Sequence, residues 1–262
     1  MRAARAILAL GLCLCAGRAA GEQFDFTRLV QSSSLDRGDL TTAYTLEVSR
    51  SLSVITKGPG GGGGGGGLGG QRDYDGVSHR LAAYYGILRW LSVGVDQTLQ
   101  QRSASEFQYG VLAAETRFRL PALERLGIQP SLFVGPRIRV NARRGHTLVA
   151  GTGLERNTGR LKLVVDLGAE AAVTEDNRAN SLRYEAGAHY QLTGVLSAAL
   201  EAWGVLEWPE AGPFQYAHHG GPTLKLRLQR FWAAANVGFG VKDRPNKDFY
   251  DATCMVQLGF AL

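Results

Sequence analysis

The sequence has no long apolar run beyond its first residues. Hydrophobic residues make up 45% of the 262, yet no segment after residue 21 offers the roughly 18 uninterrupted apolar residues that a transmembrane helix needs. This excludes a bundle of membrane-spanning helices. It does not exclude membrane insertion, because a strand of a transmembrane barrel is apolar at only half of its positions.

Cysteine is also scarce. Cys13 and Cys15 lie within the first 21 residues, so a chain that loses this segment keeps only Cys254 and cannot form an internal disulfide. Both early cysteines follow a leucine, whereas a lipid-attachment site needs a small residue there, and lipidation is not expected. Cys254 is predicted to act as a small hydrophobic residue.

Motifs for phosphate, metal or cofactor binding are missing. The glycine-rich stretch 58–70 is followed by Gln71 and Arg72, whereas a phosphate-binding loop needs a lysine and then serine or threonine. It predicts a flexible surface loop. His218 and His219 fall in a predicted loop without the spacing of metal ligands. No cofactor is expected.

The first residues have the pattern of a signal peptide. Arg2 and Arg5 precede the apolar run 6–16, small residues follow, and cleavage after Ala19 or Gly21 is expected. Removal of residues 1–21, which contain three arginines and no acidic residue, lowers the formal charge from +6 to +3. This mild charge gives no reason to expect a nucleic-acid partner.

The last thirteen residues, 250–262, alternate with a period of two. One face is wholly apolar, with Val256, Leu258 and Phe260 at its centre, and the other is small or polar apart from Met255. This period predicts a strand. An apolar strand at a sheet edge invites aggregation unless another strand pairs with it. Closure into a barrel pairs this edge, and a membrane around the barrel accommodates the apolar outer face.

The same alternation recurs along the chain and predicts twelve strands. Their ranges are 40–54, 77–86, 91–100, 107–120, 131–141, 147–156, 161–174, 181–192, 196–207, 223–229, 231–241 and 250–262. The segment 147–156 alternates poorly. The fold predicted is an all-β, transmembrane, antiparallel up-and-down β-barrel of about twelve strands, with ten or fourteen as alternatives.

The predicted organisation is a signal peptide (1–21), an N-terminal periplasmic extension that lines or plugs the barrel base (22–39), and the barrel (40–262). Short connections alternate with longer ones, as periplasmic turns alternate with outer loops in this class. Aromatic residues fall near both strand ends and predict interfacial girdles.

Two other folds compete with the barrel. Helices can be drawn over 80–95 and 192–208, but glycines interrupt both segments. A secreted β-sandwich would also have alternating strands and a leader. In the barrel only one orientation of the faces is allowed, because the reverse would put Glu115, Arg117 and Arg137 into lipid at about 2–4 kcal/mol for each basic residue near the midplane.

The permitted orientation predicts a charged lumen. Its candidate pore-lining residues are Arg80, Glu115, Arg117, Arg119, Arg137, Arg139, Lys162, Asp166, Glu170, Arg183, Glu185, Glu201, Lys225 and Arg227, accompanied by Glu47 and Asp96. One interpretation is an ion-pair network that fills a narrow barrel. The other is a polar channel in which arginines on neighbouring strands favour anionic or polar aromatic solutes.

An enzyme is a third possibility. Some outer-membrane lipases use a serine, a histidine and an asparagine, and His79 falls on the predicted lipid face. No serine-centred motif accompanies it, and a histidine tolerated in a strand is the simpler interpretation. No catalytic residue is assigned.

The hairpin sequence Tyr85-Gly-Ile-Leu-Arg-Trp-Leu-Ser-Val-Gly-Val95 and the closing Val256-Gln-Leu-Gly-Phe-Ala-Leu262 resemble those of bacterial outer-membrane β-barrel proteins. More narrowly they resemble the porins grouped with the MetA pathway of phenol degradation. The sequence departs from such barrels at Leu262, where phenylalanine is usual, and has Phe260 two places earlier. The resemblance implies passage of small, including aromatic, solutes and transfers no site residues.

The function expected is passive, porin-like transport of small polar, anionic or aromatic solutes across the outer membrane. The alternative is a closed barrel with a structural role or a surface role through the loops 58–75 and 208–217. The partners expected are outer-membrane lipid, small solutes, and the barrel-assembly machinery, which would recognise the strand 250–262.

Overall fold

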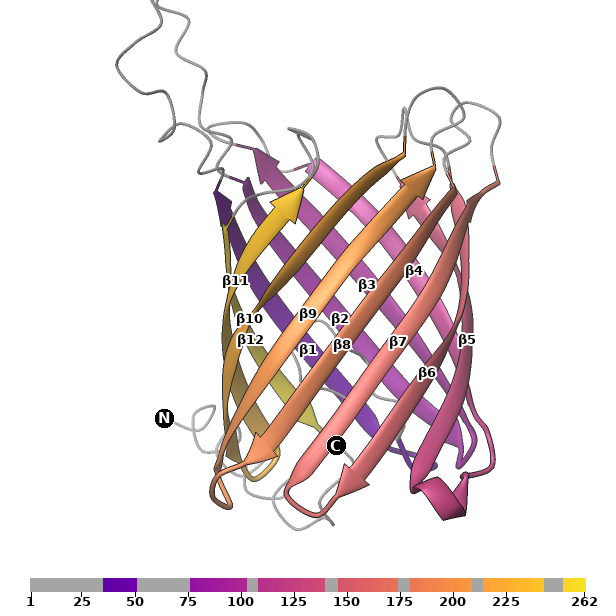
Figure 1. The fold of residues 1–262 in the computed structure, drawn as a ribbon, viewed down its shortest axis with the longest axis vertical. Coiled ribbons are helices and arrows are strands. Elements are labelled where there is room, and N and C mark those ends of the chain that lie inside the picture. Colours follow the sequence, from indigo (N-terminus) through magenta and orange to yellow (C-terminus); the bar gives the residue numbers. More distant parts are fainter. Residues whose placement is uncertain are drawn as a thin grey trace, which may run out of the picture.

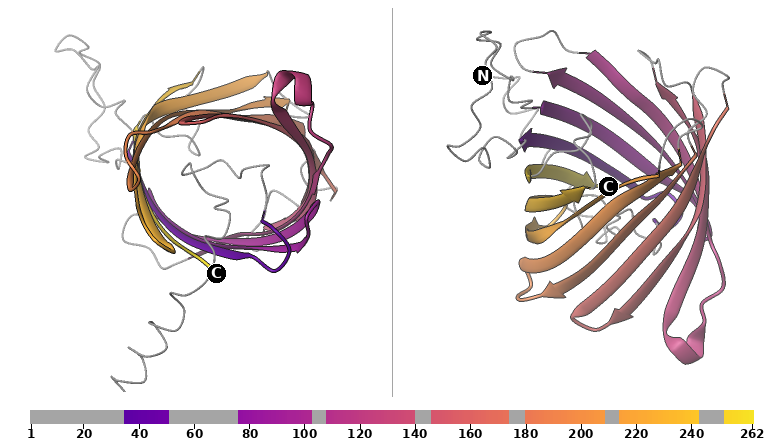
Figure 2. Two further views of the ribbon diagram at one scale, coloured as in Figure 1. Left: turned by 90° about the horizontal axis from the view of Figure 1, so that it is seen from below. Right: turned by 45° about the horizontal axis from the view of Figure 1, so that its top comes forward.

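The computed structural model describes residues 35–50, 76–102, 108–139, 146–173, 180–208, 214–242 and 252–262. Within them the chain forms one closed antiparallel barrel in which every strand pairs with its neighbours in sequence. The first and last strands close the ring, with Tyr44 opposite Leu258. Figure 1 shows the tilted strands and Figure 2 shows the ring from below. The predicted twelve-stranded up-and-down barrel is confirmed.

The strands are similar in length. Their bounds are β1 (Leu40–Arg50), β2 (Gly76–Leu88), β3 (Leu91–Arg102), β4 (Gln108–Arg119), β5 (Ile128–Arg139), β6 (Thr147–Thr158), β7 (Leu161–Ala172), β8 (Asn180–Gln191), β9 (Leu196–Trp208), β10 (Gln215–Leu228), β11 (Phe231–Lys242) and β12 (Ala252–Ala261). A short 3-10 helix, η2 (Glu124–Leu126), lies between β4 and β5. No helix among the described residues is long and apolar enough to cross a membrane.

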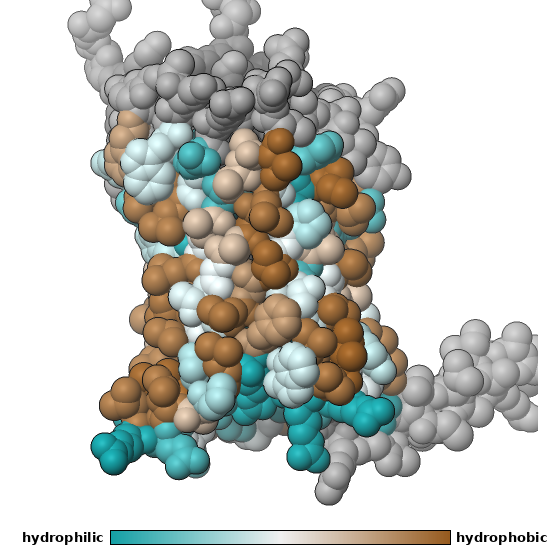
Figure 3. Space-filling view, turned by 90° about the vertical axis from the view of Figure 1, so that its right-hand side faces the viewer, coloured by the Kyte–Doolittle hydropathy of each residue, from teal (hydrophilic) through white to brown (hydrophobic). Residues whose placement is uncertain are grey.

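Burial alternates along the strands and separates an inner from an outer face. In β12, Met255 and Gln257 are buried, whereas Val256 and Leu258 are exposed. Since the barrel is closed, the buried face points inward, and the apolar face points outward as predicted. Figure 3 shows hydrophobic side chains covering the flank and hydrophilic ones gathered at the lower end. An apolar outer surface of this kind requires lipid around it.

Short turns join the strands at one end of the barrel, the short-turn end. Arg89 and Trp90 connect β2 to β3, and Gly159 and Arg160 connect β6 to β7. Leu40 N donates to the Leu262 carbonyl oxygen at 3.1 Å at this same end. It corresponds to the periplasmic end of this class of barrel. The connections at the opposite end include residues outside the described ranges.

Aromatic side chains collect at both ends of the outer surface. At the short-turn end the ring centroids of Trp90 and Phe118 lie 6.4 Å apart, and those of Phe231 and Phe260 lie 4.7 Å apart. At the other end Trp208 lies 5.4 Å from Phe214. Such pairs mark the interface between lipid and water. The predicted end positions of Trp90, Phe118, Phe231, Phe260 and Trp208 are confirmed, whereas Phe214 was not predicted.

The prediction for β10 was wrong at its start. This strand begins at Gln215 rather than at residue 223, so His218 and His219 lie in a strand and not in a loop. Its Gly-Gly-Pro sequence suggests a turn, but β9 and β11 pair with it on both sides and hold it extended, with Gly221 opposite Glu201. The proposed contact loop 208–217 is correspondingly shorter, because Trp208 still belongs to β9.

Other strand boundaries moved by a few residues. β2 and β3 continue to a two-residue turn, whereas a four-residue turn, 87–90, was predicted. β5 begins at Ile128 instead of residue 131, because Gly127 adopts a left-handed φ of 60° that ends η2 and starts the strand at once.

The residues before β1 enter the barrel base. Gly38 N donates to the Gly86 carbonyl oxygen at 2.8 Å, and Gly86 N donates to the Asp39 carbonyl oxygen at 3.0 Å. A Cβ on Gly86 would collide with the Asp36 carbonyl oxygen, so this close approach needs glycine. Leu35, only 1% exposed, clusters with inward residues that include Tyr84 and Trp232. The remaining parts of the predicted leader and extension (1–34), and the glycine-rich stretch 58–70, lie outside the described residues.

Candidate functional site

The predicted pore-lining residues occupy inward positions of the strands. In the alternation set by the buried residues, Arg80 shares its face with Ala82 and Tyr84, and Arg119 shares its face with Arg117. The same alternation puts the following on the inner face: Glu115, Arg137, Lys162, Asp166, Glu170, Arg183, Glu185, Glu201, Lys225 and Arg227. Arg139 is in β5, but its side chain lies outside the described part of the structure.

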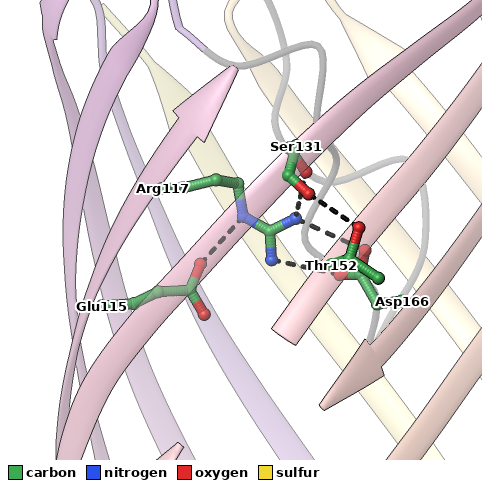
Figure 4. A network of polar contacts seen from close by, with 5 residues as sticks. All are labelled: Glu115, Arg117, Ser131, Thr152 and Asp166. Carbon is green, nitrogen blue, oxygen red and sulfur yellow. Dashed lines mark hydrogen bonds and ion pairs between the residues drawn. The ribbon is translucent and has the colours of Figure 1, made fainter. Parts of the chain in front are cut away.

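Arg117 is the centre of a buried network that joins three strands. Its side chain is 2% exposed, and its Nη2 lies 3.1 Å from Asp166 Oδ2 while its Nε lies 2.9 Å from Glu115 Oε1. A second donor, Nη1, reaches Asp166 Oδ1 at 3.4 Å. Figure 4 shows the guanidinium between the two carboxylates. The paired contact with Asp166 uses the planar fork of arginine, which lysine lacks.

Small residues on the strands between β4 and β7 make this network possible. Ser131 Oγ accepts from Arg117 Nη1 at 3.4 Å, and Thr152 Oγ1 donates to the Ser131 carbonyl oxygen at 3.0 Å (Figure 4). A Cβ on Gly153 would collide with Asp166 Oδ1. The glycines that weaken the alternation of β6 therefore leave room for the Arg117–Asp166 pair.

Glu170 gathers a second group of charges nearer the other end. Thr147 Oγ1 donates to its Oε1 at 2.5 Å, and Arg183 Nε lies 2.8 Å from its Oε2. Arg137 Nη1 lies at 3.9 Å from the same Oε2. The two arginine side chains are 39% and 33% exposed, although both belong to the inner face.

The arginines of β4 and β5 lie at different heights. Arg117 pairs in register with Phe133, whereas Arg137 pairs with Ala113. Two carboxylates compensate the charge of Arg117, and Arg80 forms an ion pair with Asp96. Arg117 therefore fits the interpretation of an ion-pair network in the packed wall, and the attraction of anions by the arginines of these strands stays a prediction.

Several inward residues were missed from the sequence. Glu155 is 4% exposed and lies 3.9 Å from Lys162, and its strand was the least regular in the sequence. Trp203 stacks on His219 with centroids 5.7 Å apart. His189 is also buried. The alternation put His189 and Trp203 on the inward face, but only charged residues were selected as candidates, and Glu155 was missed because its strand alternates poorly.

Aromatic rings of the inner face lie against glycines of the next strand. Tyr84 pairs in register with Gly94, and Trp232 pairs with Gly259. A Cβ on either glycine would collide with the facing ring. The rings therefore lie along the wall, and each fills the space that its glycine leaves.

The outer histidines have tyrosine partners. Tyr44 Oη lies 2.7 Å from His79 Nδ1, and Tyr184 Oη lies 2.7 Å from His218 Nδ1. A hydrogen bond lowers the free energy of a polar group that faces lipid. Among the described residues there is no group of three or more His, Cys, Asp and Glu side chains placed to hold a metal ion. Cys254 is exposed on the outer face.

Two solved structures share this architecture. An outer membrane channel from Pseudomonas putida F1 has 9% sequence identity and a TM-score of 0.57, over 88% of this chain and 98% of that chain. The NanC porin also has 9% identity, with a TM-score of 0.56, over 84% of this chain and 98% of that chain. No family model and no curated protein matches the chain. The narrower resemblance to the MetA-pathway porins stays a prediction.

At this identity the similarity concerns the fold. By their descriptions, one of these two structures is an outer membrane channel and the other is a porin. Each described strand carries large hydrophobic residues that are exposed on the outer face, as a lipid-embedded barrel requires. Fold and surface together indicate an outer-membrane location, and the chain has the fold of outer-membrane channel barrels.

Proposed function

We propose that this barrel is a porin-like passive channel for small polar solutes, with anionic and polar aromatic ones included. One observation carries the proposal: Arg183 and Arg137 are 39% and 33% exposed on the inner face. An inward side chain of a closed barrel is exposed to the lumen or to its mouth, and both arginines lie toward the end opposite the short turns. This space can hold water and solute, and it gives a solute that enters the barrel access to both arginines.

The strand number is compatible with a narrow channel. Eight-stranded barrels are filled by side chains and barrels of sixteen strands leave an aqueous channel, so twelve is intermediate. Polar groups that line such a lumen select solutes by charge and hydrogen bonding. The descriptions of the two similar structures as a channel and a porin support the same function.

The proposal also treats the protein as a channel and not as a lipid-modifying enzyme. His79, the candidate on the lipid face, has Tyr44 as hydrogen-bond partner at 2.7 Å. His218 has the same arrangement with Tyr184. The repetition supports a structural role for these histidines, since a catalytic group would have no reason to recur with the same partner.

A closed, structural barrel is the second candidate. Leu35 is 1% exposed and packs on inward residues at the short-turn end. This packing supports a lumen that the residues before β1 narrow at that end. Three further proposals hold for either candidate. They are cleavage of the leader 1–21, a base-lining role for residues 22–39, and recognition of the strand 250–262 by the assembly machinery.

Liposome swelling distinguishes the two candidates. The mature chain, residues 22–262, is refolded into vesicles that contain an impermeant polymer, and the vesicles are diluted into isosmotic solutions of small neutral, anionic or aromatic solutes. A channel gives swelling rates that fall with solute size. Absence of swelling from protein shown to be folded and inserted would reject the channel and favour the closed barrel.

A further inference from the structure

Arginines gather around the short-turn end of the barrel. The described connections at this end are 89–90, 120–127, 159–160, 192–195 and 229–230, and all but 192–195 contain an arginine. These four arginines and Arg156, which lies on the outer face of β6 near the same end, form the arginine rim: Arg89, Arg125, Arg156, Arg160 and Arg230. Its members are exposed, except that Arg230 is half-buried.

The excess of positive charge is specific to this end. The short connections contain four basic residues and one acidic residue, Glu124. The connections at the opposite end are 51–75, 103–107, 140–146, 173–179, 209–214 and 243–251, and in the sequence they contain nine acidic and seven basic residues. Basic character is therefore a property of the short-turn end and not of the connections in general.

The arginine rim borders the lipid-facing surface. Arg89 directly precedes Trp90, and Arg230 directly precedes Phe231, whose side chains are 52% and 62% exposed. Both rings belong to the aromatic pairs that mark the interface at this end. Figure 3 shows the hydrophilic residues of the lower end directly beneath the hydrophobic flank. The level of the rim is thus the level of the lipid headgroups.

Arg156 indicates most clearly which medium the rim meets. It is exposed on the outer face two residues before β6 ends, with Leu154 preceding it on that face. Its partner in register on β7 is Leu163, which is also exposed on the outer face. The long arginine side chain lies along this apolar surface and carries its guanidinium to the headgroups. A water-soluble partner could contact this position only by displacing lipid.

We propose that the arginine rim binds the phosphate groups of anionic phospholipids in the leaflet around the short-turn end, which is the periplasmic leaflet. A guanidinium donates two parallel hydrogen bonds to phosphate oxygens, and the net charge of an anionic headgroup adds to the attraction. Successive turns at this end lie two strands, or about 10 Å, apart, so each turn meets a separate headgroup. The inference goes beyond the proposed function, because it holds for an open and for a closed barrel.

Two tryptophans provide separate reporters for the two ends. Of the four in the chain, Trp203 and Trp232 are buried on the inner face, whereas Trp90 and Trp208 are exposed on the outer face at opposite ends. Trp208→Phe leaves Trp90 as the lipid-facing reporter, and Trp90→Phe leaves Trp208. Each variant of the refolded mature chain is placed in phosphatidylcholine vesicles with increasing fractions of acyl-brominated phosphatidylglycerol or, in parallel, acyl-brominated phosphatidylcholine. Bromine quenches a nearby indole, so the two series give the relative affinity for the headgroups.

At low salt Trp90 is expected to report a preference of about fivefold for phosphatidylglycerol, as one basic residue at an anionic surface implies, and Trp208 is expected to report none. Arg89→Gln, in the Trp208→Phe background, should abolish the preference at Trp90. Arg160→Gln is the matched control, because it removes the same charge from the rim on the far side of the β4–β5 turn. It should leave the preference at Trp90 unchanged.

No preference at Trp90 would overturn the inference and favour an acidic water-soluble partner for the rim. An equal preference at Trp90 and Trp208 would also overturn it, because selection would then not depend on the arginine-rich end. An equal loss in Arg89→Gln and Arg160→Gln would reject local binding in favour of diffuse attraction by the whole surface. None of these results requires solute flux, so failure of the channel proposal is distinguishable from failure of this inference.

Discussion

The inner wall has two regions of different chemistry. From β4 to β8 it is charged, and its residues Arg117, Asp166, Glu170 and Arg183 contact one another across strands. On β11 and β12 the inward residues whose burial is described are uncharged. Both regions face the same lumen and belong to the same ring (Figure 2). The lumen is therefore electrostatically asymmetric.

The two regions also satisfy their polar groups differently. In the charged wall a guanidinium takes two carboxylates, as Arg117 does. An amide of the neutral wall meets a hydroxyl of the strand beside it: Gln257 Nε2 of β12 donates to Thr45 Oγ1 of β1 at 3.1 Å, and Asn236 Nδ2 of β11 donates to Thr223 Oγ1 of β10 at 2.8 Å. Removal of one member of a buried ion pair leaves a charge, but removal of one member of a neutral pair leaves only a dipole. The charged wall should consequently be the more sensitive to single substitutions.

The largest effect is expected from Asp166→Asn, which breaks the charged wall. Arg117, 2% exposed, would keep only one carboxylate partner. We expect a loss of about 3–5 kcal/mol in the free energy of unfolding, as for other buried ion pairs from which one partner is removed. Urea titration of the barrel folded in phospholipid vesicles, followed by tryptophan fluorescence, measures it. The exposed Glu124→Gln serves as control, and an equal loss in both variants would contradict the central place of Arg117.

A smaller effect is expected from Gly259→Ala in the neutral wall. The added methyl group would collide with the Trp232 indole, which must then move. Overpacking of this kind costs about 1–3 kcal/mol in unfolding free energy. Gly194→Ala is the matched control, since nothing lies within 4 Å of a Cβ at that position. Similar midpoints for the two variants in the same titration would show that the ring–glycine packing contributes no stability.

The smallest effect is expected from Thr45→Val, which removes the β1 hydroxyl that accepts a hydrogen bond from Gln257 of the neutral wall. The bond from Gln257 is lost, at a cost of about 1 kcal/mol. Thr42→Val changes the same residue type on the outer face of β1, where a methyl group suits lipid, and no loss is expected there. A loss from Thr45→Val as large as that from Asp166→Asn would remove the distinction between the two walls.

The fold could be predicted from the sequence because lipid imposes a strict rule on every strand. Val256 and Leu258 must face outward and Gln257 inward, so period two persists throughout the barrel. The start of β10 was missed because Gly220, Gly221 and Pro222 suggest a turn locally, while the ladders to β9 and β11 that keep them extended are contacts distant in sequence.

The candidate site could be predicted only as a set of inward residues. Alternation identifies Arg117 and Asp166 as inward, but they are 49 positions apart and their contact depends on register across three strand pairs. The sequence also gives no measure of how much space Gly153 leaves beside them. Only the structure shows which of these residues form ion pairs. It therefore also shows which arginines stay exposed on the inner face.

Single-channel conductance in a planar bilayer tests the central claim, that the asymmetric lumen is an open polar channel, most directly. The account predicts stable current steps from the refolded mature chain. It also predicts a reversal potential that shifts toward cation selectivity in the Arg137→Gln/Arg183→Gln double variant, because these two inner arginines are the ones that stay exposed beside Glu170. Silence from protein shown to be folded and inserted would contradict it.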